Sequence, residues 1–123
     1  MKKRTSISKY LKFNNIIVCS EELSKIAYET NTKLRVRIIR KAKDCVIDAI
    51  SEIAKNCLKG NIPLKTCDFN NLRKYQHILR RLSQKSSVVK RKKLVKQLGN
   101  SLQFLIWPAL QLIGSVISRF IEK

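Results

Sequence analysis

The sequence is poor in several residue types, and each shortage excludes a class of structure or function. Its 123 residues include only three Gly and two Pro, too few for a chain that is disordered throughout. It contains no glycine-rich loop of the kind that cradles phosphates. No segment shows the alternating, β-branched pattern of a strand. With 44% hydrophobic residues, the sequence predicts one all-α domain with a modest core.

Groups suited to catalysis are also scarce. The chain has eight Asp and Glu residues and one His, and no two acids have the spacing of an acid/base pair or a metal site. His77 lies among cations, a setting that disfavours its use as a positioned base. We therefore expect no enzymatic activity, no catalytic residue and no cofactor.

The four cysteines lack the spacing of a metal site. Cys19, Cys45, Cys57 and Cys67 form no CxxC pair and match no common zinc motif. We expect buried free thiols in a reducing compartment, with a Cys57–Cys67 bridge across the turn as the alternative. The apolar run at 16–19 is too short for a signal peptide, so secretion by that route is not expected.

The charge of the chain is strongly positive and unevenly distributed. Its 27 Lys and Arg residues give a formal net charge of +19, and such self-repulsion favours a polyanionic partner. Double-stranded DNA is the first candidate and an anionic membrane surface the second. From Phe69 to Lys96 there is no acid. The candidate phosphate contacts are the ten cations of this block, Arg73, Lys74, Arg80, Arg81, Lys85, Lys90, Arg91, Lys92, Lys93 and Lys96.

Nothing in this block indicates that bases are read. Its cations outnumber the Asn, Gln and Ser side chains that contact base edges, and its aromatic residues are too few for a single-strand stacking platform. The sequence therefore predicts non-specific binding to the phosphate backbone, and condensation of DNA.

The basic block is followed by an apolar end. Residues 97–118 carry no charge and predict a hydrophobic C-terminal helix from about 101 to 121. Three roles are open: a helix of the protein's own core or of a homo-oligomer, a helix at a membrane interface, and a membrane span, for which residues 102–117 are short at about 24 Å. The candidate membrane- or partner-docking residues are Leu102, Phe104, Leu105, Ile106, Trp107, Leu110, Leu112, Ile113, Val116 and Ile117.

Apolar periodicity and capping residues divide the rest of the chain. Gly60 and Pro63 end the longest periodic segment, which forms a helical hairpin with the basic helix after it. A short Lys-rich helix follows, capped by Ser86 or Ser87 and ended at Gly99. We expect a flexible basic arm at 1–19, a helical basic domain at 20–100 with helices at about 20–30, 32–59, 66–84 and 87–98, and the C-terminal helix within 101–123.

Four stretches of the sequence resemble one family. Asn56–Leu64 is similar to the N-x-L-K-G-N-x-P-L signature of small basic virion proteins encoded by Polinton/Maverick elements and adintoviruses. Residues 72–75 and 79–82 resemble the basic helix of that family, and residues 90–97 resemble its K-R-K-x-L-V-x-Q segment. Pro108 and residues 112–115 resemble its hydrophobic C-terminal end.

The resemblance implies a setting for the basic surface. Members of that family are regarded as minor virion components comparable to the core or cement peptides of adenoviruses. It implies a protein of the virion interior that packs double-stranded DNA, present in the host nucleus or cytoplasm during assembly. Membrane activity during entry and docking to a capsid protein are the alternatives. The chain departs from the pattern at Cys57, where an aliphatic residue is usual, and at Leu98–Gly99–Asn100, where the family has a double glycine.

Overall fold

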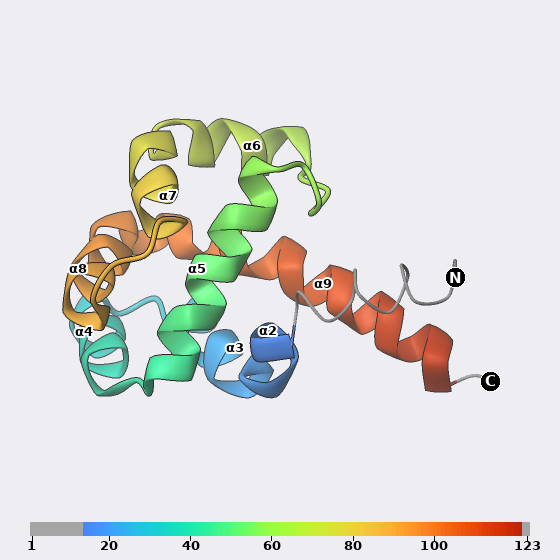
Figure 1. Ribbon diagram of the computed structural model, residues 1–123, viewed down its shortest axis with the longest axis horizontal. Helices are drawn as coiled ribbons and strands as arrows, with labels where there is room; N and C mark the ends of the chain where they lie inside the picture. Colours follow the sequence, from blue (N-terminus) through green and yellow to red (C-terminus); the bar gives the residue numbers. More distant parts are fainter. Residues whose placement is uncertain (1–13, 122–123) are drawn as a thin grey trace.

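The computed structural model describes the backbone of residues 14–121 and the side chains of residues 15–114. Within this part of the chain the fold is all-helical, without a strand (Figure 1), so the predicted fold class is confirmed. Its elements are α2 (Asn14–Val18), α3 (Ser20–Tyr28), α4 (Thr32–Lys41), α5 (Asp44–Leu58), α6 (Thr66–Arg73), α7 (Gln76–Leu82), α8 (Val88–Leu98), a 3₁₀ turn (Gly99–Ser101) and α9 (Leu102–Ile121).

Helix α5 lies at the centre of the fold (Figure 1). It contacts α2, α3, α7, α8 and α9, and one hydrophobic cluster joins all of them. Its apolar residues are buried around most of its circumference, since helices cover it on several sides; these residues are Val46, Ile47, Ala49, Ile50, Ile53 and Ala54.

The first half of α9 belongs to the protein's own core. The buried residues of α9, at positions 102, 105, 106, 108, 109 and 113, lie on a helix that packs against α3, α5 and α6. The docking role expected for Leu102, Leu105, Ile106 and Ile113 is therefore wrong for this fold, because those side chains are already covered. Phe104, Trp107, Leu110 and Leu112 are half-buried against the same core, and the side chains of Val116 and Ile117 lie outside the described residues.

The C-terminal half of α9 extends beyond the other helices (Figure 1). No helix in the described part of the chain combines the length and the apolarity needed to cross a membrane.

The predicted helix end at Gly60 is confirmed, with φ of 77°. The N–H of Gly60 donates to the carbonyl of Cys57 at 3.2 Å, and the N–H of Asn61 donates to the carbonyl of Asn56 at 2.9 Å. These two bonds form a Schellman motif. The Asn61 side chain also donates to the buried Asn56 side chain at 2.9 Å, so the signature Asn56–Leu64 builds the end of α5.

Two helices predicted as continuous are broken. The segment 32–59 divides into α4 and α5 because Ala42 and Lys43 are extended, with ψ of 143° and 156°. The break separates the basic end of α4, Arg40 and Lys41, from the acidic start of α5, Asp44. Each charge then lies at the helix end that its sign favours. It also lets α4 turn toward α8.

The segment 66–84 divides at Lys74 and Tyr75 into α6 and α7. Helix α6 packs mainly against α9, whereas α7 packs against α5 and α8. The predicted hairpin with α5 is therefore made by α7. The N-cap residue of α6 is Lys65, whose side chain makes no capping hydrogen bond.

The flexible arm expected at 1–19 is wrong for its last six residues. Helix α2 packs against α5, with Ile16 and Cys19 buried. The amide of Asn15 donates to the Glu52 carboxylate at 3.0 Å. A helix of this length is too short to show periodicity in a sequence window. Residues 1–13 lie outside the described residues.

Candidate nucleic-acid interface

Helices α4, α7 and α8 bring together many of the surface cations of the described residues. Helix α8 contacts both α7 and α4, and the three lie next to one another at the left of Figure 1. The ammonium of Lys92 donates to the carbonyl of Arg40 at 2.7 Å, which joins α8 directly to the end of α4. The basic cluster is defined as nine exposed or half-buried cations, those of the C-terminal half of α4 and those of α7 and α8 apart from Arg91: Arg37, Arg40, Lys41, Arg80, Arg81, Lys90, Lys92, Lys93 and Lys96.

The orientation of α8 decides which of its cations face outward. Leu94, Val95 and Leu98 are buried, and residues three, four and seven positions apart share one face of a helix. Lys93 and Lys96 fall on the opposite side. The predicted Lys-rich helix therefore presents ammonium groups to solvent while it packs on the core.

Arg91 is the exception, and its predicted role as a phosphate contact is not supported by its position. It precedes Leu94 by three residues and Val95 by four, so it points inward with them. Its Nη1 donates to the Asp48 carboxylate at 2.6 Å and to the Ser51 hydroxyl at 3.3 Å. Arg91 therefore fastens α8 to α5. The same spacing, readable in the sequence, distinguishes it from its neighbours.

The other predicted cations divide by location. Arg80 and Arg81 are exposed on α7, and Lys85 is exposed in the loop that leads to α8. Arg73 ends α6 and Lys74 is its C-cap residue, so both lie on the helix that packs mainly against α9. The structure brings together six of the ten predicted cations, which are Arg80, Arg81, Lys90, Lys92, Lys93 and Lys96, on α7 and α8.

Sequence reasoning missed the contribution of α4. The sequence predicted one continuous helix at 32–59, and Arg37, Arg40 and Lys41 were not among the candidate phosphate contacts. The break at Ala42 places them beside α8 instead. Arg35 on the same helix is buried, and its Nη1 donates to the Glu29 carbonyl at the end of α3 at 2.9 Å. Its role is structural, since a cation is favourable at a helix C-terminus.

The basic cluster has few acids to neutralise it. Among the described residues the one salt bridge joins Arg91 to Asp48, and neither belongs to the cluster. No acid lies between Asp68 and Glu122 in the sequence. Unpaired cations on adjacent helices create a positive potential that attracts polyanions.

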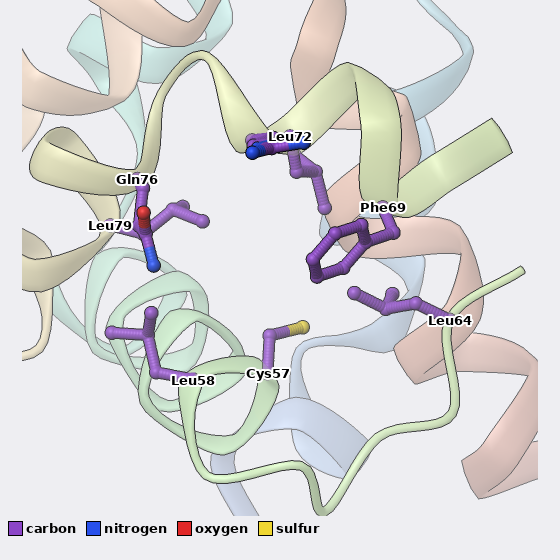
Figure 2. A pocket seen from close by; sticks show the side chains of 8 residues that line it. Cys57, Leu58, Leu64, Phe69, Leu72, Gln76 and Leu79 are labelled. Atoms are coloured by element: carbon purple, nitrogen blue, oxygen red, sulfur yellow. The ribbon is translucent and has the colours of Figure 1, made fainter. Parts of the chain in front are cut away.

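An apolar pocket of about 380 Å³ lies between α5, α6 and α7 (Figure 2). The Cys57 sulfur points toward Leu64 and Phe69, and Leu79 lies across the cavity. Burial raises the pKa of the Cys57 thiol to about 12, so this thiol is unreactive near neutral pH.

All four cysteines are free. The alternative Cys57–Cys67 bridge is not formed. Cys67 is exposed on α6, and Cys57 faces the apolar pocket. Within the part of the chain that the structure describes, no three His, Cys, Asp or Glu side chains gather closely enough to hold a metal ion.

No protein-family model, curated protein or solved structure matches this chain. The stretches that resemble the Polinton/Maverick signature have different places in the fold. Asn56–Leu64 caps α5 and forms the turn after it, whereas residues 90–97 are most of α8. The first is a folding motif and the second carries part of the basic cluster.

Proposed function

We propose that this protein binds double-stranded DNA without sequence specificity, through the phosphate backbone, and that the basic cluster is its contact surface. The observation that carries the proposal is the packing of α8 against both α4 and α7, with cations on all three helices. Among the described residues no salt bridge involves a member of the basic cluster. The phosphate backbone of duplex DNA is the polyanion that such a surface fits best.

The chemistry of the cluster favours the backbone over the bases. The exposed residues of α8 are Lys90, Lys93, Val89 and Gln97, so two ammonium groups and a single amide reach solvent fully from this helix. Lysine acts as a point charge toward a phosphate, whereas base reading requires directional donors and acceptors. If about six of these cations contact phosphates, log affinity falls with log salt at a slope of roughly −5.

The biological setting of the proposal rests on the resemblance to Polinton/Maverick and adintovirus proteins. A protein that neutralises phosphates without reading sequence suits the packing of a genome inside a particle. We therefore propose a virion protein that condenses DNA, is not an enzyme, and meets the genome in the host cell during assembly.

Paired double variants test the assignment of the surface. The test variants are Lys90→Gln/Lys93→Gln and Arg80→Gln/Arg81→Gln, which remove exposed cations of the cluster. The control is Lys59→Gln/Lys65→Gln, which removes the same charge in the turn between α5 and α6, at the side of Figure 1 away from α8. Far-UV circular dichroism verifies that each variant is folded.

Each test variant should reduce the slope of log affinity against log salt by roughly 1.8, because each phosphate contact contributes about 0.9. Binding at low salt should weaken by roughly tenfold for any duplex sequence. The control should change the slope by much less. Equal effects of test and control variants would show that only net charge matters and that the cluster is not the contact surface.

A second role, docking to a partner through the end of α9, is favoured by the extension of that helix beyond the others (Figure 1). Gln111 and Gly114 are exposed there. The partner of this proposal is a capsid protein, with an anionic membrane or a second copy of the chain as the alternatives. A chain ending after Gly114 retains the described core, unlike one ending at Asn100, which loses buried α9 residues.

Comparison of that shortened chain with the full chain tests the second role. Flotation with anionic vesicles at low salt, sedimentation equilibrium, and co-sedimentation with assembled particles report the three partners in turn. We expect the shortened chain to lose co-sedimentation with assembled particles and to retain DNA binding. Particle association that is unchanged by the truncation would contradict docking through this helix.

A further inference from the structure

Two cysteines far apart in the sequence have their sulfur atoms 3.2 Å apart, Cys19 and Cys45. Cys19 lies between α2 and α3, and Cys45 is in the first turn of α5. We propose that this pair is a disulfide-forming site, which closes under oxidising conditions and fastens the N-terminal helices to α5. The inference is independent of the proposed function.

The geometry requires little movement for the bond to form. A disulfide has an S–S distance of about 2.05 Å, so the sulfurs need to approach by about 1.2 Å. Cys19 lies between α2 and α3, as the N-cap residue of α3. Both of these helices pack against α5. Both thiols are therefore held on elements that the core already fixes with respect to one another. Of the other two cysteines, Cys57 faces the apolar pocket and Cys67 is exposed on α6.

The two thiols differ in access. Cys19 is buried and Cys45 is half-buried, so a reagent in solution reaches Cys45 first. Burial, followed by the hydrogen bond with Cys45, raises the pKa of the Cys19 thiol to about 11. Cys19 therefore stays protonated near neutral pH, and exchange begins at Cys45.

The oxidant in this proposal is a small disulfide such as oxidised glutathione. The Cys45 thiolate attacks one sulfur of that disulfide, forms a mixed disulfide and releases one glutathione thiolate. Cys19 then loses its proton and attacks the Cys45 sulfur, which releases the second glutathione. In total, two protein thiols and one glutathione disulfide become one protein disulfide and two glutathione thiols.

The bond would change the stability of the whole fold. It closes a loop between positions 26 residues apart, and a cross-link over such a loop restricts the unfolded chain. We expect the melting temperature to rise by roughly 10 °C. Reduction with dithiothreitol should reverse the rise, since the reduced pair is the state seen in the structure.

The full chain with Cys57→Ala and Cys67→Ser isolates the pair. These substitutions remove the two remaining thiols, including the exposed one that could cross-link separate molecules. The sample is incubated with oxidised glutathione, alkylated and digested with trypsin. Cleavage at Lys12, Lys25, Lys43 and Lys55 places Cys19 in peptide 13–25 and Cys45 in peptide 44–55, so the linked pair is identified by its mass.

The expected result is one dominant product in which 13–25 is linked to 44–55 and the intact mass has fallen by two hydrogens. The rise in melting temperature should be absent after the further change Cys45→Ala or Cys19→Ala. The unsubstituted chain should give the same linkage. A stable mixed disulfide with glutathione, two unmodified thiols, or a linkage to Cys57 or Cys67 in the unsubstituted chain would each overturn the proposal.

Discussion

Glu52 is a carboxylate that the fold only partly satisfies. One of its oxygens accepts a hydrogen bond from Asn15 at 3.0 Å, while the other is buried without a protein partner. Burial raises the pKa of the Glu52 carboxyl, and the nearby Asp48 carboxylate adds to the rise, although Asn15 and Lys55 oppose it. The ionised form is therefore less favourable in the folded protein than in the unfolded chain.

The sign of this shift gives a pH dependence. Above the ordinary value of 4.5 the unfolded chain loses the proton first and binds fewer protons than the fold. The contribution of Glu52 to stability is therefore complete below that pH and falls as pH rises toward the folded pKa. Glu52→Gln keeps an oxygen for Asn15 and removes the charge.

We expect the free energy of unfolding of Glu52→Gln, measured by urea denaturation, to fall less than that of the unsubstituted protein between pH 4.5 and neutrality. Parallel pH profiles for the two proteins would contradict the assignment of this shift.

Arg91 and Lys93 are two residues apart but have opposite environments. Arg91 bonds Asp48 and Ser51 on α5, whereas Lys93 is exposed. Arg91→Gln leaves Asp48 without its partner and should lower the free energy of unfolding by about 1–2 kcal/mol. Lys93→Gln should change it by less than about 0.5 kcal/mol.

In DNA binding we expect the opposite order of effects, with the larger change for the Lys93 variant. Lys93→Gln should reduce the salt slope of duplex binding by about 0.9, and Arg91→Gln should leave the slope nearly unchanged. Urea denaturation and fluorescence anisotropy measure the two quantities. A larger change of slope for Arg91→Gln than for Lys93→Gln would contradict this assignment and would show that Arg91 contacts DNA.

At the scale of helices, the sequence predicts ends that depend on local chemistry. Gly60 and Gly99 have positive φ, and the Ser87 hydroxyl accepts from the N–H of Lys90 at 3.3 Å. These ends follow from the residues themselves. The breaks at Ala42 and Tyr75 contain neither Gly nor Pro, and they arise because successive helices pack on different partners. Such breaks depend on tertiary contacts that a single sequence does not display.

The break before α5 makes a stability prediction. Lys43 is the N-cap of α5 and its side chain makes no capping bond. Lys43→Ser supplies an oxygen for a free N–H of the first turn, so the free energy of unfolding should rise by about 0.5–1 kcal/mol. The melting temperature should rise by roughly 4 °C.

Lys41, in the last turn of α4, provides the matched control. Lys41→Ser should lower stability by a few tenths of a kcal/mol, since serine is a weaker helix former than lysine. If residues 32–59 formed one continuous helix, Lys43→Ser would also lower the free energy of unfolding. Thermal unfolding of the two variants therefore tests the break.

At the scale of the molecule, acid-bearing and acid-free parts of the chain pack together. Every acid within residues 14–121 lies at or before Asp68, whereas α7, α8 and the described part of α9 have none. The second group covers α5 and presents its cations outward. Apolar residues of both parts are buried in one core. The net charge of +19 is not balanced within the chain, and we propose that a partner neutralises it.

The candidate site is only partly readable from the sequence. The acid-free block at 69–96 identifies most of the cations, because charge runs are visible without a fold. The exclusion of Arg91 also follows from the sequence, through its spacing of three and four residues to the apolar Leu94 and Val95. The inclusion of α4 requires the break at Ala42, which the sequence does not display. The placement of α9 in the core follows from its contacts with α3, α5 and α6, which an apolar run alone does not specify.

The salt dependence of duplex binding by the full chain tests the central claim most directly. Two duplexes of equal length and unrelated sequence should bind with similar affinity at low salt, and log affinity should fall with log salt at a slope of roughly −5 for both. No binding at low salt, a slope near zero, or a hundredfold preference for one sequence would contradict non-specific phosphate binding by the basic cluster.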